Sequence, residues 1–253
     1  MQNLNYGVIG NCSTAALISE KGAIEWLCFP EFDSPSVFAA ILDRQKGGHF
    51  GFKVTSDYKV TQSYVPHTNI LSTHFESEEG AFDVVDFMPC YPTSDGKDFY
   101  RPAEIYRYIR WAKGRPRMKV DYRPAPNYAR GKTIYNVTSQ YVETYSSVEN
   151  KDRQYLYSSL DLKKVVNHDE ITLEKDEFFL FSFNEKVIPV DIEREKLEYC
   201  RTLVYWLNWT DHAKRYTRYN EVIERSMLVL KLMTYRNGAV MAAVTTSLPE
   251  TVG

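Results

Sequence analysis

Gly22-Ala-Ile-Glu-Trp-Leu-Cys-Phe-Pro-Glu-Phe-Asp-Ser-Pro-Ser-Val-Phe-Ala-Ala-Ile-Leu42 is the stretch of sequence that decides the fold. A turn at Gly22 is followed by alternating residues that place Ile24, Trp26 and Cys28 on one face of a short strand. Pro30 cannot donate a hydrogen bond to a β-ladder, so the strand should end there. The stretch therefore predicts a strand that leads into a proline-bounded loop.

The residues after this strand predict a rigid loop and then a short helix. Asp33 or Ser34 can cap a helix that carries four apolar side chains, Val37, Phe38, Ile41 and Leu42. The loop itself carries Glu31, Phe32 and Asp33, and rigid loops between packed elements are common places for binding groups. The alternative is that the prolines and aromatic residues only shape a buried corner.

Composition excludes several classes of protein. The chain has 253 residues, a formal net charge of −2 and no run of basic residues, which argues against nucleic acid as a partner. It lacks an apolar run of 18 residues, and its first twenty residues do not resemble a secretory signal, so no membrane partner is expected. The four cysteines lie far apart and the five histidines are scattered, which predicts free, mostly buried thiols in a cytoplasmic protein and no metal.

Residues 5–187 predict a large β-structure. About a dozen short extended segments alternate with turn residues, which indicates an antiparallel two-sheet sandwich. Residues 115–121 are expected to pair with residues 105–111 across Lys113-Gly114. The loop between Pro89 and Pro102 is long enough to suggest a function. The 19 Tyr, 13 Phe and 4 Trp suit sugar stacking, although a β-rich core needs such rings too.

Near Pro189 the pattern changes from strands to helices. Asp191 can cap a helix that runs to about Trp209, with Leu197, Cys200, Val204 and Leu207 forming one apolar stripe. A second helix over about residues 219–235 is apolar nearly all round, and Asn237-Gly238 ends it. The chain then finishes on apolar residues, which suggests a complete β domain followed by the beginning of an all-helical one.

Several long motifs resemble the amino-terminal region of the glucoamylase- and trehalase-like glycoside hydrolases (family 15). They are Tyr6-Gly-Val-Ile-Gly-Asn11, Thr14-Ala-Ala-Leu17, Gly22-Ala-Ile-Glu-Trp-Leu-Cys28, Phe32-Asp-Ser-Pro35, Tyr122-Arg-Pro-Ala-Pro-Asn-Tyr128, Glu224-Arg-Ser-Met-Leu-Val-Leu-Lys-Leu-Met-Thr-Tyr235 and Thr245-Thr-Ser-Leu-Pro-Glu250. In that family a β-sandwich precedes an α/α toroid of six helix pairs. The resemblance implies a sandwich domain over residues 1–190, a linker helix over 191–214, and an incomplete start of the helical domain over 215–253.

The resemblance also implies the chemistry of the parent protein. Inverting glycosidases use two carboxyl groups roughly 6.5–9.5 Å apart, one as acid and one as base. Both catalytic glutamates of the family lie in the helical domain, beyond Gly253, so we expect no catalytic residue, no cofactor and no activity in this chain alone. Phe32 is expected to stack on a sugar, with Asp33 and Ser34 beside it, while Thr245, Thr246 and Ser247 line the pocket floor. The alternative for residues 32–34 is a turn whose polar groups only satisfy backbone donors.

The preferred hypothesis is therefore the non-catalytic β-sandwich region of a hydrolase that releases glucose from α-glucosides. In this hypothesis the region packs against the helical barrel and shapes the pocket rim, and the barrel binds the α-glucoside or oligosaccharide substrate. One alternative is a stand-alone carbohydrate-binding module. Another is an interaction protein that forms a homo-oligomer through its exposed terminal helix.

Overall fold

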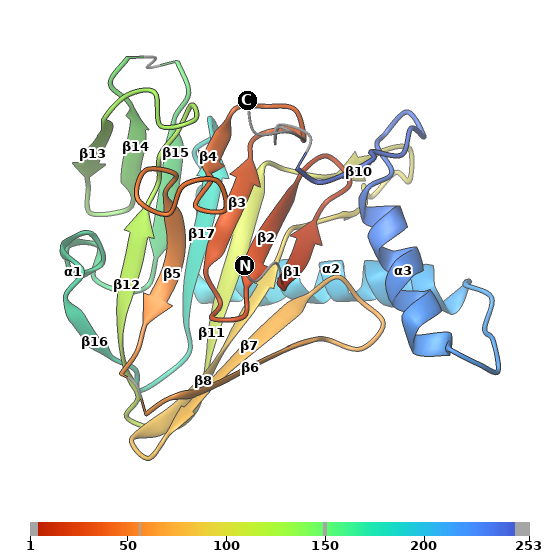
Figure 1. Ribbon diagram of the computed structural model, residues 1–253, viewed down its shortest axis with the longest axis horizontal. Coiled ribbons are helices and arrows are strands. Elements are labelled where there is room, and N and C mark those ends of the chain that lie inside the picture. The colour runs from red at the N-terminus through yellow and green to blue at the C-terminus, as the bar shows by residue number, and fades with distance from the viewer. Residues whose placement is uncertain (1–4, 56, 149–150, 246–253) are drawn as a thin grey trace.

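The protein is a two-sheet antiparallel β-sandwich with helices packed on one side (Figure 1). A computed structural model describes residues 5–55, 57–148 and 151–245. Strands dominate these residues, so the predicted mainly β fold is confirmed.

The first sheet has seven strands in the order β1-β2-β3-β5-β12-β16, with β4 attached to β3. All of its pairings are antiparallel. Its strands are β1 (Tyr6–Gly10), β2 (Ala15–Ser19), β3 (Ile24–Cys28), β4 (Ser36–Phe38), β5 (His49–Lys53), β12 (Arg117–Arg123) and β16 (Glu170–Thr172).

The second sheet has eight strands in the order β13-β14-β15-β17-β11-β8-β7-β6. These strands are β6 (Lys59–Tyr64), β7 (Leu71–Ser77), β8 (Gly80–Phe87), β11 (Glu104–Gly114), β13 (Thr133–Val137), β14 (Val142–Ser146), β15 (Gln154–Ser158) and β17 (Glu177–Phe183). The suspected loop after Pro89 carries a separate small hairpin, β9 (Tyr91–Pro92) and β10 (Phe99–Tyr100).

Aromatic rings fill the space between the two sheets. Phe50 of the first sheet and Phe179 of the second have ring centroids 5.3 Å apart, and Phe38 and Phe181 have centroids 5.5 Å apart. Such ring pairs add specific contacts to the burial of apolar area. These rings are therefore core residues, which was the alternative to sugar stacking.

One charged side chain crosses this core. Arg107 on β11 is fully buried and donates from Nε to an Asp86 carboxylate oxygen at 2.7 Å. Its other nitrogens donate to the carbonyl oxygens of Phe50, at 2.6 Å, and of Gly22. The Gly22 turn of the first sheet is thus fixed by an arginine of the second sheet.

A second core lies on the outer face of the eight-stranded sheet. Alternate residues of its strands, including Phe87, Tyr106 and Leu180, pack there with residues of α2 (Ile192–Asp211) and α3 (Asn220–Leu232). The Asp191 carboxylate caps α2 as predicted, accepting from the Arg194 amide at 2.8 Å. Figure 1 shows α2 behind the sheet and α3 at one end of the molecule.

Two predictions about the strands are wrong. The helix expected over residues 37–42 is absent, because Ser36 and Phe38 pair with β3 and Phe38 packs into the main core. The expected hairpin of residues 105–111 with 115–121 is also absent. β11 is already paired on both sides, with β8 and β17, so β12 crosses to the first sheet and pairs with β5 and β16.

Two other segments differ in detail. Within residues 132–146, one strand ends at Val137, and β14 follows as a separate strand. The sequence analysis also missed the short helix α1 (Leu162–Asn167), which Asp161 caps through the Lys163 amide.

Candidate functional site

The β3–β4 loop, where substrate contacts were predicted, is a tight turn. Phe32 has only 2% of its surface exposed and belongs to the second core, and its amide donates to the Ser13 carbonyl at 3.0 Å. The Ser34 hydroxyl accepts from the Glu31 amide at 3.1 Å. Asp33 is exposed. In this structure the loop therefore presents Asp33 and part of Ser34 to solvent, while the Phe32 ring is packed.

The segment that follows α3 returns to this loop. Its turn is closed by a hydrogen bond from the Tyr235 amide to the Ala239 carbonyl at 2.8 Å. The Trp26 indole then donates to the Val244 carbonyl at 3.0 Å. Thr245, which is half-buried, comes next, whereas the predicted site residues Thr246 and Ser247 lie outside the described residues.

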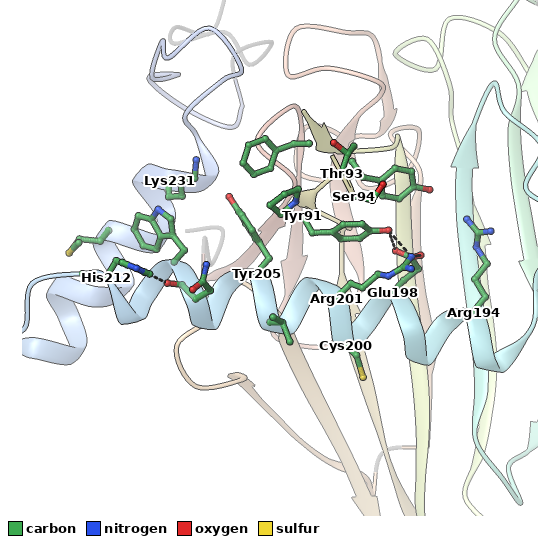
Figure 2. A pocket seen from close by; sticks show the side chains of 18 residues that line it. Tyr91, Thr93, Ser94, Arg194, Glu198, Cys200, Arg201, Tyr205, His212 and Lys231 are labelled. Atoms are coloured by element: carbon green, nitrogen blue, oxygen red, sulfur yellow. Dashed lines mark hydrogen bonds and ion pairs between the residues drawn. The ribbon is translucent and has the colours of Figure 1, made fainter. Parts of the chain in front are cut away.

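A groove of about 1320 Å³ lies between the β9–β10 hairpin and helices α2 and α3 (Figure 2). Aromatic rings form much of its wall. Tyr91 and Tyr100 have ring centroids 5.1 Å apart, and Phe99 meets Tyr205 edge to face at 6.0 Å. Trp209 of α2 also lines it. Long, mostly apolar grooves with a few polar groups bind ligands or other protein segments.

A polar cluster stands at one side of this groove. The Tyr91 hydroxyl donates to Glu198 Oε2 at 2.7 Å, and Arg201 contacts the other oxygen of the same carboxylate at 3.3 Å. Burial, together with the hydrogen bond to Glu198, raises the pKa of Tyr91 above its ordinary value. Figure 2 shows these three side chains pointing toward one another between the hairpin and α2.

Helix α2 packs with the face opposite to the predicted one. The stripe expected to be buried is open, with exposed fractions of 48% for Leu197 and 63% for Val204, and Cys200 is exposed as well. Tyr205 and Trp206 face the sheet instead. That prediction is wrong because two large rings bury more apolar area than several small aliphatic side chains do.

The buried face of α2 also carries an isolated carboxyl group. Glu195 is 1% exposed, and its Oε1 atom has no hydrogen-bond partner in the described structure. Burial, reinforced by the nearby carboxyl groups of Asp86, Glu198 and Glu104, raises the pKa of Glu195 well above its ordinary value. The Glu195 carboxyl therefore holds its proton more tightly than an ordinary glutamate does.

Comparison with known proteins identifies the family. Residues 5–150 match the family described as "Trehalase-like, N-terminal". The chain belongs to the trehalase-like N-terminal domain family.

Full-length relatives extend this similarity past the matched region. The chain is 31% identical over 247 residues to the trehalase of Thermoplasma acidophilum, an alignment that covers 94% of this chain and 41% of the relative. It is 33% identical over 255 residues to trehalase 1 of Sulfolobus acidocaldarius, covering 98% and 40% respectively. It is 28% identical to the trehalase of Mycolicibacterium smegmatis, again over 98% of this chain and 40% of the relative. The chain thus spans about two fifths of the length of these relatives.

The described residues of the chain include three buried cysteines, Cys12, Cys28 and Cys90, and the exposed Cys200. The sulfur atoms of Cys12 and Cys90 are 4.0 Å apart. No group of three or more His, Cys, Asp or Glu side chains among these residues could hold a metal ion. The helices of the described residues are all too short or too polar to cross a membrane.

Most residues of the groove were not predicted from the sequence. The length of the 89–102 loop was a usable signal, and the loop contains Tyr91, Phe99 and Tyr100. The contribution of α2 had only a partial signal: Cys200 and Val204 of the predicted stripe line the groove, whereas Tyr205 and Trp209 lie outside that stripe.

Proposed function

We propose that this chain is the non-catalytic β-sandwich region of an inverting glycoside hydrolase that releases glucose from α-glucosides, with trehalose as the first substrate to test. The observation that carries the proposal is its coverage of proteins named trehalases. Nearly the whole chain aligns with them, but it accounts for only about 40% of their length.

The exposed face of α2 supports a role beside a larger partner domain. Leu197, Val204 and Leu207 form an apolar stripe on the outside of the described structure, next to the aromatic groove. Contiguous apolar surface of this kind is unusual on an isolated domain and is typical of an interface. In this proposal the stripe and groove pack against the helical barrel, Asp33 and Ser34 contribute to the rim of its pocket, and Thr245 contributes to the pocket floor.

The proposal is tested by assaying two proteins in parallel. The 253-residue chain should release no glucose from trehalose or maltooligosaccharides, whereas the longer protein that contains it should release glucose with inverted anomeric configuration, detected by NMR. Hydrolysis by the 253-residue chain that a substitution within it abolishes would refute the non-catalytic role. Absence of hydrolysis by the longer protein would refute the activity.

The aromatic groove favours a second candidate, a carbohydrate-binding module of the same fold. Tyr91, Tyr100 and Trp209 offer rings on which sugars could stack, and Glu198 and Arg201 offer hydrogen-bonding groups. Isothermal titration of the 253-residue chain with maltooligosaccharides distinguishes the two. Binding that Tyr91→Ala removes would favour the module, and absence of binding favours the structural role.

A further inference from the structure

Two side chains, one on β3 and one in the β3–β4 loop, contact the segment that leads to Thr245. Trp26 on β3 is fully buried, and its indole donates to the Val244 carbonyl, 218 positions along the chain, at 3.0 Å. Glu31 in the β3–β4 loop accepts from the Tyr235 hydroxyl through Oε1, and the same oxygen lies 3.2 Å from an Arg236 guanidinium nitrogen. The β3 strand and the β3–β4 loop thus contact both ends of the segment 235–244.

Between these two sets of contacts the segment has little regular secondary structure. It contains the turn closed by the Tyr235–Ala239 hydrogen bond, an isolated bridge between Thr234 and Val240, and a bond from the Met241 amide to the Met233 carbonyl at 2.9 Å. No helix or strand spans it in the described structure. Its path therefore depends on contacts to other elements, and Figure 1 shows it running from α3 back toward the first sheet.

The contacts at the two ends of the segment differ in burial. The Trp26 ring lies in a small apolar cluster with Cys28 and Ala39, so its indole N–H has a fixed direction. The Glu31 contacts are partly exposed, and exposed ion pairs contribute little to folding stability. The Glu31 contacts are thus suited to fix a position rather than to hold the fold together.

We propose that Trp26 and Glu31 are positioning residues, which orient the 235–245 segment so that Thr245 reaches the substrate pocket. This inference rests on the proposed function, since it concerns the same pocket. The contacts of Trp26 and Glu31 with the segment can nevertheless be tested without any hydrolysis. Neither residue touches the reacting atoms. Their effect passes through Val244 and through the turn that begins at Tyr235.

Hydrogen exchange of the 253-residue chain tests whether the Glu31 contacts order the segment. Glu31→Gln keeps the shape of the side chain but removes the anionic acceptor, and it should speed exchange of the amides of residues 239–245. The matched control is Glu25→Gln, because Glu25 lies on β3, the strand just before the Glu31 loop, and accepts from a tyrosine hydroxyl, that of Tyr6, at 2.6 Å. Equal exchange of these amides in both variants would overturn the inference.

Steady-state kinetics of the longer protein with trehalose test the positioning. Glu31→Gln and Tyr235→Phe should each raise KM between about twofold and tenfold, the range expected for loss of one hydrogen-bonded contact. The double variant should match Glu31→Gln alone, because Tyr235→Phe removes only one of the two contacts that Glu31 makes. A merely structural role would lower the amount of active enzyme, and thus the apparent kcat, without moving KM.

Three outcomes are decisive for these experiments. A KM for Glu31→Gln equal to that of Glu25→Gln, in an enzyme that does hydrolyse trehalose, would overturn the positioning role alone. Trp26→Phe removes the indole donor at a buried site, so a failure of this variant to fold leaves Glu31→Gln as the deciding change. If the unsubstituted longer protein released no glucose, the proposed function and the KM effect would both be refuted. Hydrogen exchange would still decide whether Glu31 orders the segment.

Discussion

Glu195 makes the stability of this protein depend on pH. Its pKa is raised in the folded state, mainly by burial, from an ordinary value of 4.5. Above that pH the unfolded chain binds fewer protons at this site than the folded chain, so stability falls as pH rises, until the folded pKa is reached. The slope within this window is about 1.4 kcal/mol per pH unit.

Glu195→Gln should remove this slope, because the amide cannot ionise. We expect the variant and the parent to have similar free energies of unfolding at pH 4, and the variant to be more stable at pH 8. Urea titrations at both pH values measure the difference. Glu198→Gln is the control, since Glu198 has two partners and its replacement should destabilise. A parent whose stability rises from pH 4 to pH 8 by as much as that of Glu195→Gln would contradict this account.

Arg107 is the second residue whose replacement has a defined cost. Arg107→Met leaves the Asp86 carboxylate buried without its guanidinium partner, which should cost about 3–5 kcal/mol of folding free energy. Adding Asp86→Asn should restore a large part of that loss, because the buried charge is then gone. The urea midpoints of the single and double variants give the measurement. A single-variant loss below about 1 kcal/mol would show that the pair is not desolvated as the structure indicates.

At the scale of a single element, α2 has two faces with opposite tolerance to substitution. Val204→Lys lies on the exposed stripe and should change the unfolding free energy by less than about 0.5 kcal/mol. Trp206, two positions further along α2, lies on the packed face, and Trp206→Ala should lower the unfolding free energy by about 3–5 kcal/mol. Thermal unfolding followed by circular dichroism compares the two variants. The reverse order would mean that α2 packs with its aliphatic stripe inward, as its sequence pattern suggests.

The same helix shows how far the sequence could predict the fold and where it could not. The Asp191 cap and the length of α2 follow from local signals, as do most strands, whose alternation and turn residues are encoded nearby. The facing of α2 does not, because it depends on which rings fit the outer face of a sheet formed by distant residues. The partner of β12 is likewise set by competition, since β8 and β17 already occupy both edges of β11.

The candidate site, too, could be predicted only where its residues are close together in the sequence. The β3–β4 loop and the approach to Thr245 could be proposed from the sequence because their motifs are contiguous, and their role at a substrate pocket stays a prediction. The groove was not found, because its wall joins the β9–β10 hairpin to helices α2 and α3, which are distant from the hairpin in sequence. Neither Trp26 nor Glu31 showed a sequence signal for the contact with residues 235–244, which joins positions more than 200 apart.

At the scale of the whole molecule, the helices complete the fold of the sandwich. The predicted boundaries at residues 190 and 214 stay untested, and the packing of α2 and α3 makes them measurable. α2 covers Phe87 and Tyr106 on the outer face of the eight-stranded sheet, and α3 buries Leu228 and Leu232 against the same core. Fully burying one such side chain is worth about 1.5–3 kcal/mol.

Two truncations should therefore behave differently. Residues 1–214 keep α2 but lose the two buried leucines of α3, so this chain should fold with a free energy of unfolding lower by roughly 3–6 kcal/mol. Residues 1–190 expose the aromatic outer face and should aggregate or bind a hydrophobic dye, because that face has no cover. Size-exclusion chromatography and urea unfolding measure both. A soluble, cooperatively folded 1–190 chain would show that the β-sandwich is a domain in its own right, and that α2 belongs to whatever packs on its exposed stripe.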